Sequence, residues 1–271
     1  MSESLLRVDS LTKSYDGKTN ALSDVSFSIE PGEFVALIGS SGAGKSTLLR
    51  CINRLIEPTS GVVTFDGKDM GSLRGKQLRI ARRRMAMIFQ GYNLVLRSNS
   101  LENVLQGRLG YKSSLAGALS IYTEEEKQSA FNALEQVGME EFAYTRADQL
   151  SGGQKQRIGI ARALVQDPLL ILADEPIASL DPHSSTVVMD HLKRASKELG
   201  IACLVSLHQV EFALEYSDRV LCLSHGQFCC GGKPSEITPE VIASIYEEVE
   251  DGIAGVSAVQ EGVTPVQRAG R

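Results

Sequence analysis

The sequence predicts an α/β fold with a parallel sheet at its core, an antiparallel β layer before it and a helical subdomain within it. A continuous apolar run at 34–38 leads into a glycine-rich loop and a helix-like stretch from 45 to about 55. This order of strand, loop and helix is typical of the start of an α/β core. Two further buried-strand candidates, 169–173 and 202–207, are separated by a helical pattern, as parallel βαβ units require.

The antiparallel layer is predicted over residues 5–29. Short apolar-alternating segments there are bounded by the turn-forming pairs Asp16-Gly17 and Pro31-Gly32. Such alternation is typical of strands that bury one face. We therefore expect a small β layer at the N-terminal side of the core.

A helical subdomain is predicted at about 92–166, where strand-like runs disappear. Helical spacing there brings Ala130, Leu134 and Val137 to one face. We expect residues 1–246 to form one domain. After it, an acidic stretch leads into a mixture of Gly, Val and Gln without a sustained period, so 247–271 is expected to be a flexible tail.

Composition limits the classes of protein to consider. The chain has 271 residues, of which 42% are hydrophobic, enough to bury a substantial core. Its apolar runs are far shorter than the roughly 20 residues that a membrane-spanning helix needs, and the first ten residues do not resemble a secretory signal. We therefore expect the chain in the cytoplasm.

The charge of the chain disfavours a general nucleic-acid binder, since the formal net charge is −5. One run, Arg82-Arg83-Arg84, is locally basic. We interpret this run as the solvated end of a helix.

Five cysteines show no zinc-binding spacing, and their odd number suits a reducing compartment better than a disulfide framework. We interpret them as buried or half-buried thiols. The adjacent Cys229 and Cys230 are expected to point to opposite faces of a strand, which disfavours a shared metal.

The motif with the most specific chemistry is a P-loop pattern after the first buried strand. Its residues are Gly39, Ser40, Ser41, Gly42, Ala43, Gly44, Lys45 and Ser46, and we include Thr47 in the expected nucleotide-binding set. Backbone N–H groups of such a loop can surround phosphate oxygens, and the following helix adds positive potential. Lys45 can reach the β and γ phosphates, and Ser46 can offer its hydroxyl to Mg²⁺. The alternative, a glycine-rich turn with a surface lysine, fits the strand and helix on either side poorly.

Two adjacent carboxylates, Asp174 and Glu175, come at the end of an apolar strand, where α/β sheets bind ligands. Beside a P-loop, this pair suggests that Asp174 holds Mg²⁺ and that Glu175 is the base for an attacking water. Without the P-loop, such a pair would usually begin a solvated loop.

A second glycine-containing turn comprises Ser151, Gly152, Gly153 and Gln154. It introduces a helical run, with Ser151 in the position of an N-cap. The paired glycines leave backbone donors exposed at a helix N-terminus, which makes a second anion site. As a bare pattern, this turn would more often be only a cap.

These motifs, in this order and spacing, resemble the ABC ATPase family over about residues 5–246. The resemblance implies that the chain binds ATP and Mg²⁺ and hydrolyses ATP. It also implies a head-to-tail homodimer in which each P-loop nucleotide is capped by the other copy's turn at 151–154. Such a protein lies on the cytoplasmic face of the inner (plasma) membrane, beneath permease subunits, with a periplasmic substrate-binding protein as an indirect partner and no nucleic acid.

The same resemblance assigns roles to four further residues. Tyr15 matches the aromatic residue that stacks on adenine, and Gln90 matches the glutamine that contacts Mg²⁺ and water. Asp181 matches a residue at the dimer seam, and His208 matches the histidine that senses the γ-phosphate. Without the resemblance, a glutamine at a strand end is usually solvated and a lone histidine is usually structural.

Four stretches resemble the ATP-binding subunits of bacterial phosphonate importers. They are 50–55, 107–111, 173–182 and 206–210. The resemblance implies transport of phosphonate or a related phosphorus oxyanion such as phosphite. An importer for another small polar solute stays open as an alternative, and so does a soluble ABC ATPase outside transport, although neither a second cassette nor a long coiled-coil insertion appears. A nucleotide sensor without activity is disfavoured by Glu175 and His208.

Overall fold

The computed structural model describes residues 4–240, 242 and 243, so the predicted tail at 247–271 lies outside the described residues. The strands are β1 (Leu6–Ser14), β2 (Asn20–Ile29), β3 (Phe34–Ile38), β4 (Ser60–Phe65), β5 (Lys68–Asp69), β6 (Met85–Ile88), β7 (Leu170–Asp174), β8 (Ala202–Leu207), β9 (Arg219–Ser224) and β10 (Gln227–Gly232). The helices are α1 (Lys45–Ile52), α2 (Gly75–Arg83), α3 (Ser100–Leu105), α4 (Ser114–Ala118), α5 (Glu124–Gln136), α6 (Gly152–Leu164), α7 (Pro182–Leu199) and α8 (Val210–Tyr216). Short 3₁₀ helices are η1 (Gln106–Tyr111), η2 (Glu140–Phe142), η3 (Ala147–Gln149) and η4 (Pro234–Glu236).

The central sheet has six strands in the order β10-β9-β3-β8-β7-β6, all parallel except β10. Strands β3, β7 and β8 are buried along their whole length. Because both faces of these strands are covered, they appear in the sequence as continuous apolar runs without alternation. The predicted α/β class is confirmed.

The second sheet is antiparallel, in the order β2-β1-β4-β5, and confirms the predicted β layer. Two of its strands, β4 and β5, come after α1 and were not predicted. Their turn is Asp66-Gly67, with φ of 49° and 69°, the left-handed conformation that a two-residue hairpin turn requires. An alternating strand followed by Asp-Gly was the signal available in the sequence.

Side chains of β3 alternate between two apolar clusters. Phe34, Ala36 and Ile38 pack on the face covered by α6 and α7, whereas Val35 and Leu37 pack on the face covered by α1 and the antiparallel sheet. The central sheet therefore separates two apolar clusters, one on each of its faces. Because β3 is packed on both faces, the start of the loop that follows it is held in place.

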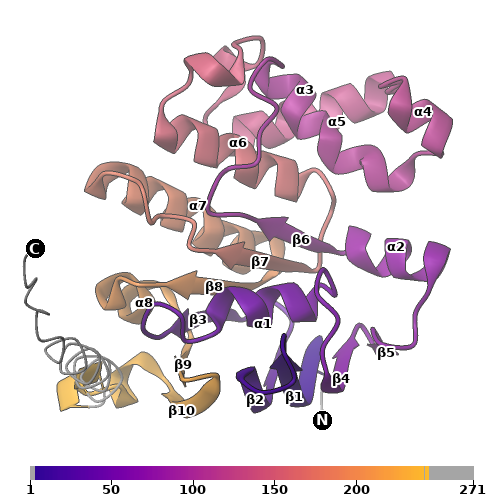
Figure 1. Ribbon diagram of the computed structural model, residues 1–271. Helices are drawn as coiled ribbons and strands as arrows, with labels where there is room; N and C mark the ends of the chain where they lie inside the picture. Colours follow the sequence, from indigo (N-terminus) through magenta and orange to yellow (C-terminus); the bar gives the residue numbers. More distant parts are fainter. Residues whose placement is uncertain (1–3, 241, 244–271) are drawn as a thin grey trace, which may run out of the picture.

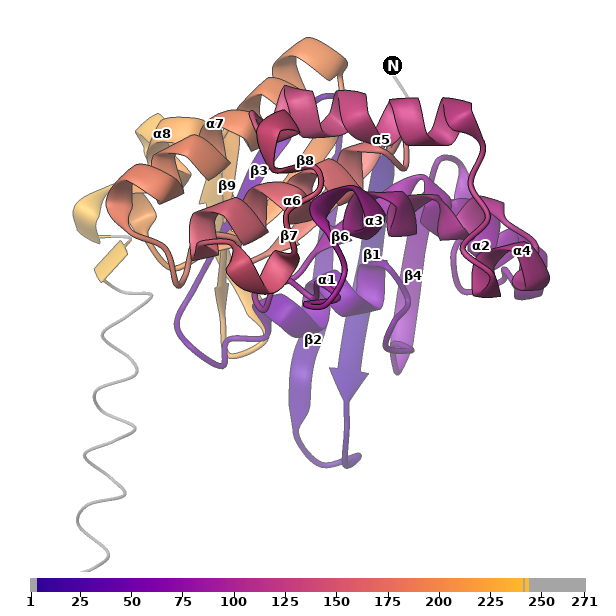
Figure 2. The ribbon, with the colours of Figure 1, turned by 90° about the horizontal axis from the view of Figure 1, so that it is seen from above.

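The interval between β6 and β7 is helical, and none of residues 89–169 joins either sheet. Figure 1 shows α3, α5 and α6 gathered at one end of the molecule, with the antiparallel sheet at the other. Figure 1 shows α4 beside α5 in this helical region, with α2 nearer the central sheet, next to β6. Figure 2 shows the contacting helices α3, α5 and α6 from above. Ala130, Leu134 and Val137 are all fully buried. Within the described part of the chain, no helix is long and apolar enough to cross a bilayer.

The arginine run at 82–84 does end a helix, α2, but the expectation that it is solvated is wrong, because all three residues are half-buried. Arg82 Nε donates to the Asn53 carbonyl at 3.1 Å. Arg83 Nε donates to the Gly110 carbonyl at 2.6 Å. The sequence pattern of α2 indicates which of its residues share a face. It does not indicate which distant segments pack against its last turn.

Candidate active site

Four parallel strands bring the predicted site residues to one edge of the central sheet. In the order stacked in Figure 1, β3 leads into the loop at 39–44, β8 into His208, β7 ends at Asp174 before Glu175, and β6 precedes Gln90. The carboxyl edge of a parallel sheet is where α/β proteins bind their ligands. Residues far apart in the sequence therefore share one edge.

The P-loop requires glycine at particular positions. Gly42 and Gly44 have φ of 80° and 104°, and a Cβ on Gly44 would come 2.5 Å from the Ala21 carbonyl oxygen. Gly44 is also the N-cap of α1 and offers no side-chain hydrogen bond. The first backbone N–H groups of α1 thus lack the partner that a capping side chain supplies, which favours an anion at this position.

Lys45 is a buried cation at this loop, with only 4% of its surface exposed. Its Nζ donates to the carbonyl oxygens of Gly39 at 2.8 Å and Ser40 at 3.0 Å. Burial lowers the pKa of Lys45, and the negative charges of Glu175 and Asp174 oppose that change. The loop therefore holds a buried ammonium group next to the start of α1, where an anion is favoured.

Ser46 and Asp174 form a pair of oxygen ligands, since Ser46 Oγ donates to Asp174 Oδ1 at 2.7 Å. Asp174 is 3% exposed, and two further groups contact it. Ser206 Oγ lies 3.3 Å from Oδ1, and Arg50 Nη2 lies 3.6 Å from Oδ2. Hydroxyl and carboxylate oxygens are the ligands that Mg²⁺ prefers, so these residues fit the metal that the motif implies.

Ser206 and Arg50 also belong to this site, although no sequence motif predicts them. Ser206 is fully buried, and its hydroxyl also accepts the backbone N–H of Glu175 at 2.9 Å. A single polar residue in the otherwise apolar strand β8 was the available signal. Arg50 is four residues after Ser46, on the same side of α1, but nothing in the sequence shows what it faces.

Glu175 has a left-handed backbone, with φ of 48°. A residue other than glycine in this region typically costs about 1–3 kcal/mol, and such residues cluster at functional sites. His208 Nε2 lies 2.5 Å from Glu175 Oε1. The family resemblance predicts that His208 senses the γ-phosphate, and the structure places its imidazole where an N–H can hold the Glu175 carboxylate in position.

Tyr15 follows β1 and is 63% exposed. Its hydroxyl is 3.3 Å from Thr47 Oγ1 in α1, and Lys13 Nζ is 5.1 Å from the centre of its ring. The ring therefore stands beside the P-loop with most of its surface open. A flat aromatic surface in this position suits stacking on a planar base.

The turn at 151–154 begins α6 with a reciprocal capping box. Ser151 Oγ accepts the Gln154 N–H at 3.2 Å, and Gln154 Oε1 accepts the Ser151 N–H at 2.8 Å. A Cβ on Gly152 would come 3.0 Å from the hydroxyl of Tyr92. No hydrogen bond joins this turn to the chain's own P-loop, both segments being fully described.

Gln90 and Asp181 lie in loops beside the site. The side chain of exposed Gln90 makes no hydrogen bond or ion pair with another residue in the part of the chain that the structure describes. Asp181 caps α7 by accepting the Ser184 N–H at 3.0 Å, and hydrogen bonds from Ser184 lower the pKa of Asp181. The roles at Mg²⁺ and at the dimer seam stay predictions.

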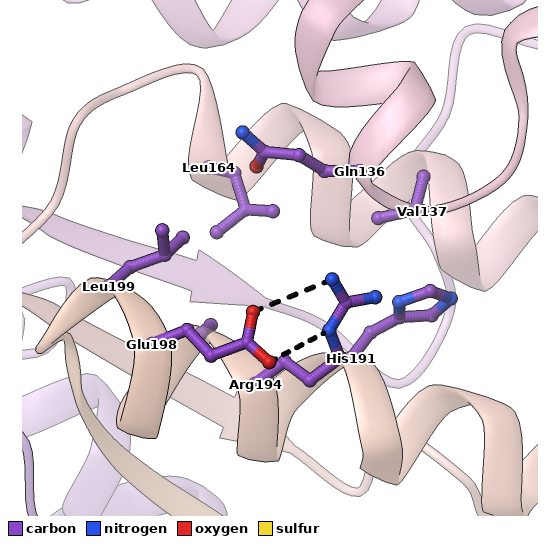
Figure 3. A pocket seen from close by; sticks show the side chains of 8 residues that line it. Gln136, Val137, Leu164, His191, Arg194, Glu198 and Leu199 are labelled. Atoms are coloured by element: carbon purple, nitrogen blue, oxygen red, sulfur yellow. Dashed lines mark hydrogen bonds and ion pairs between the residues drawn. The ribbon is translucent and has the colours of Figure 1, made fainter.

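A cavity of about 90 Å³ lies away from this edge, between the ends of α5 and α6 and one face of α7 (Figure 3). Its wall combines apolar side chains such as Leu164 with His191 and an ion pair in which Arg194 Nε is 3.4 Å from Glu198 Oε1. None of the predicted site residues lines it. It is a packing gap between the helical region and α7.

Comparison with known sequences identifies relatives over most of the chain. The ABC transporter family model matches residues 22–178. A "Phosphonates import ATP-binding protein PhnC 2" of Oceanobacillus iheyensis is 54% identical over 242 residues, covering 89% of this chain and 95% of the relative. A protein named "Phosphonates import ATP-binding protein PhnC" from Treponema denticola is 54% identical over 238 residues, covering 88% and 93%.

Solved structures agree with this placement. The ATP-binding cassette MJ0796, in a dimeric post-hydrolysis state bound to ADP and Pi, is 34% identical with a TM-score of 0.74, covering 84% of this chain and 98% of that one. The ADP conformation of MJ1267, an ATP-binding cassette of an ABC transporter, is 29% identical with a TM-score of 0.79, covering 93% and 99%. From its motifs, its fold and these relatives, the chain belongs to the ABC transporter family.

Proposed function

We propose that this chain is the ATP-hydrolysing subunit of an importer for phosphonate or a related phosphorus oxyanion. The activity is supported above all by the convergence of Lys45, Ser46, Asp174 and Glu175 at one edge of the central sheet. The substrate class is supported by relatives at 47–54% identity that are named as phosphonate import proteins.

Nucleotide binding uses the loop, the helix end and the exposed ring. The backbone N–H groups of the P-loop and the start of α1 hold the phosphates, and Lys45 turns from its two carbonyl partners to the phosphate oxygens. Tyr15 stacks on the adenine. Ser46 and Asp174 would hold Mg²⁺, which when bound withdraws negative charge from the phosphate oxygens.

Hydrolysis depends on the Glu175 carboxylate. The imidazole of His208 holds Oε1 by its N–H, which leaves the other carboxylate oxygen to orient a water and accept its proton. The water oxygen bonds to the γ-phosphorus as the bond to the bridging oxygen breaks, giving ADP and inorganic phosphate. The left-handed backbone of Glu175, tied to Ser206, keeps the carboxylate at this edge.

Completion of the site requires a second copy of the chain. The turn at 151–154 offers backbone donors at the start of α6, but it packs on Tyr92 and α7 rather than joining its own P-loop through hydrogen bonds. Two copies packed head to tail bring this turn onto the partner's nucleotide. The likeness to the dimeric MJ0796 cassette supports this arrangement.

The permease is proposed to dock in a groove of about 820 Å³ between α2, β6 and η1. Its apolar residues are Leu55, Leu78, Met85, Met87 and Phe89, and its cationic residues are Arg79, Arg82, Arg83 and Arg162. A permease helix with an apolar face and an acidic side chain fits this combination. Strand β6 lines this groove and continues directly to Gln90. A movement of the docked permease helix would therefore be transmitted to Gln90 at the nucleotide-binding edge of the sheet. This docking places the chain on the cytoplasmic face of the membrane.

The function is tested with the complete transporter, in which this chain is purified together with its permease and binding protein and placed in lipid vesicles. Binding protein loaded with a phosphonate or phosphite should stimulate ATP hydrolysis, while a transporter carrying Lys45→Ala should show no stimulation. Stimulation by sugars or amino acids alone contradicts the substrate class. Phosphonate added to the isolated chain should change nothing, because substrate is selected by the binding protein.

A further inference from the structure

Three of the five cysteines meet on the hairpin formed by β9 and β10. The strands pair antiparallel, with Phe228 opposite Leu223 and Cys230 opposite Cys222. The register shifts between Phe228 and Cys230, so Cys229 is an extra residue in β10. In such a β-bulge two residues of one strand oppose one residue of the other. Both Cys229 and Cys230 therefore face Cys222 across the hairpin.

The bulge overturns the expectation that Cys229 and Cys230 point to opposite faces. Cys222 belongs to the apolar cluster on one face of the central sheet, and Cys230 packs against that same cluster. Cys229 Sγ is also 3.4 Å from the Cys222 carbonyl oxygen. Regular alternation along a strand separates neighbouring side chains, but a bulge interrupts it.

The chemistry open to this thiol cluster is redox chemistry. Among the described residues, no group of three His, Cys, Asp or Glu side chains is arranged to hold a metal ion. Cys222 is buried, Cys230 is half-buried and Cys229 is exposed, so a small oxidant reaches the cluster from one side. Burial raises the pKa of the Cys222 thiol, and raises that of Cys229 to about 11, so these two thiols are protonated at neutral pH.

Cys222 and Cys230 are also spaced for a covalent bond. Residues directly opposite in an antiparallel pair have Cα atoms about 4.5–5.5 Å apart, within the span of about 4.4–6.8 Å that a disulfide bridges. A bond between these two sulfurs therefore needs no change of strand register.

The same hairpin holds the P-loop at two points. Leu223 is next to Cys222, and its carbonyl oxygen packs against Gly39. A Cβ on Gly39 would lie 2.2 Å from this oxygen. In the hairpin turn, the Gly226 N–H donates to the Ala43 carbonyl at 3.0 Å. Strand β9 lies directly between β3, which leads into the P-loop, and β10. These contacts leave no space between the hairpin and the P-loop. A movement of the hairpin should therefore also move the P-loop.

We propose that Cys222 and Cys230 form a reversible thiol–disulfide site that a hydroperoxide oxidises, and that the disulfide slows ATP turnover. The second part rests on the proposed function, while the first does not. In a reducing compartment the dithiol is the working form and the disulfide is transient.

The reaction balances with hydrogen peroxide as oxidant. The sulfur of Cys230, as thiolate, attacks one peroxide oxygen, the O–O bond breaks, and the released hydroxide takes a proton to leave as water. The sulfur of Cys222 then attacks Sγ of the Cys230 sulfenic acid, the S–O bond breaks, and a second water leaves. Two thiols and one hydrogen peroxide give one disulfide and two waters, and a dithiol reductant reverses the reaction.

Slower turnover follows from the shorter distance between the two sulfurs. A disulfide fixes the two sulfurs about 2.05 Å apart, which draws β10 toward β9 at Cys222. The neighbouring Leu223 carbonyl has no room to move without displacing Gly39, whose own carbonyl holds Lys45. We expect turnover to fall about tenfold, short of the roughly 10²-fold that a misplacement of about 1 Å can cause.

The test treats the full chain with hydrogen peroxide, alkylates the remaining thiols and digests with chymotrypsin, which cuts between the strands. Mass spectrometry should find a peptide linking Cys222 to Cys230, with the other three of the five cysteines alkylated. ATP turnover should fall with the extent of this link and return after dithiothreitol. The matched control Cys229→Ser should keep both the link and the response, whereas Cys230→Ser should lose both.

Each other outcome counts against a defined part of the proposal. A bond between Cys229 and Cys230, a bond between two copies of the chain, or alkylation of all five thiols overturns the site. A Cys222–Cys230 link with unchanged turnover overturns the control of hydrolysis. Absence of ATP turnover in the reduced wild-type transporter contradicts the proposed function instead, and the mapped disulfide distinguishes that case.

Discussion

The P-loop and the turn at 151–154 both expose backbone donors at the start of a helix, but the side chains that contact the two turns differ. Lys45 of the P-loop is almost entirely buried, and Ser46 of the P-loop is bonded to the buried Asp174. The turn at 151–154 has its own capping box and no hydrogen bond to that cluster. The comparison shows a chain that carries the charge and the base on one surface and a closing element on another. Under the proposed function, a site divided in this way is completed only between two copies.

The glycines of the two turns also exclude side chains for different reasons. Gly44 has a left-handed backbone, and a Cβ there would meet a main-chain oxygen. Gly152 has an ordinary helical backbone, and a Cβ there would meet the hydroxyl of Tyr92, the end of a long side chain. The P-loop is therefore fixed by main chain, whereas the second turn can adjust to a partner.

The largest effect is expected for Glu175→Gln, which keeps the size of the side chain but removes the base. A positioned base typically contributes about 10² to 10⁴ in rate, so turnover should fall by that factor. ATP affinity should stay near the wild-type value, because Lys45, Ser46 and Asp174 still hold the phosphates and Mg²⁺. Steady-state phosphate release and equilibrium binding of ATP measure the two quantities. A fall of less than tenfold rejects Glu175 as the base.

Lys45→Ala should act on binding itself, because it removes the buried cation of the P-loop. Truncating one partner of a buried charge contact costs about 2–5 kcal/mol, which weakens ATP affinity by roughly 30- to 3,000-fold. Titration with a fluorescent ATP analogue gives the affinity, and a melting curve without nucleotide shows that the fold is intact. Wild-type affinity in this variant contradicts the assignment of the P-loop.

Gly44→Ala and Gly152→Ala compare the two turns directly. The first forces an alanine into a left-handed backbone, which costs about 1–3 kcal/mol before the contact with the Ala21 carbonyl is counted. The second should change the free energy of unfolding by less than about 1 kcal/mol, because the Tyr92 side chain can turn aside. Urea denaturation of both variants measures the difference. Equal losses would show that the second turn is as rigid as the P-loop.

The smallest effect is expected for Tyr15→Ala, which removes a stacking surface outside the core. Stacking of a base on an aromatic ring is worth about 1–3 kcal/mol, and the low end of this range, about a fivefold to tenfold loss of ATP affinity, suits a largely exposed ring. Tyr15→Phe, the matched control, should bind ATP like the wild type. An unchanged affinity in Tyr15→Ala excludes the stacking role.

Much of this site was predictable because its residues are either adjacent in the sequence or lie at the ends of parallel strands. Residues 39–47 form one loop and helix start, so their types and order alone indicate phosphate binding. Asp174 and His208 end parallel strands, and parallel strands align their ends at one edge of a sheet. Short-range patterns therefore predicted the fold class and the place of the site.

The remaining features depend on contacts that no short pattern encodes. Arg50 and Ser206 reach Asp174 only after α1 and β8 pack beside β7. The bulge at Cys229 arises in the pairing of β9 with β10, so strand alternation along β10 gave the wrong orientation. The burial of Arg82 is likewise decided by segments distant in the sequence.

The division of the site between two copies is tested most directly by size-exclusion chromatography with light scattering, in ATP and Mg²⁺. Glu175→Gln should elute as a dimer, because blocked hydrolysis leaves each nucleotide between one copy's P-loop and the other's turn at 151–154. Adding Ser151→Arg should return the chain to a monomer, since a long side chain enters the opposing phosphate site. Ser151→Arg alone should bind ATP with wild-type affinity, which shows that its own P-loop is intact. A monomeric Glu175→Gln chain, or a stable dimer of the double variant, contradicts the divided site.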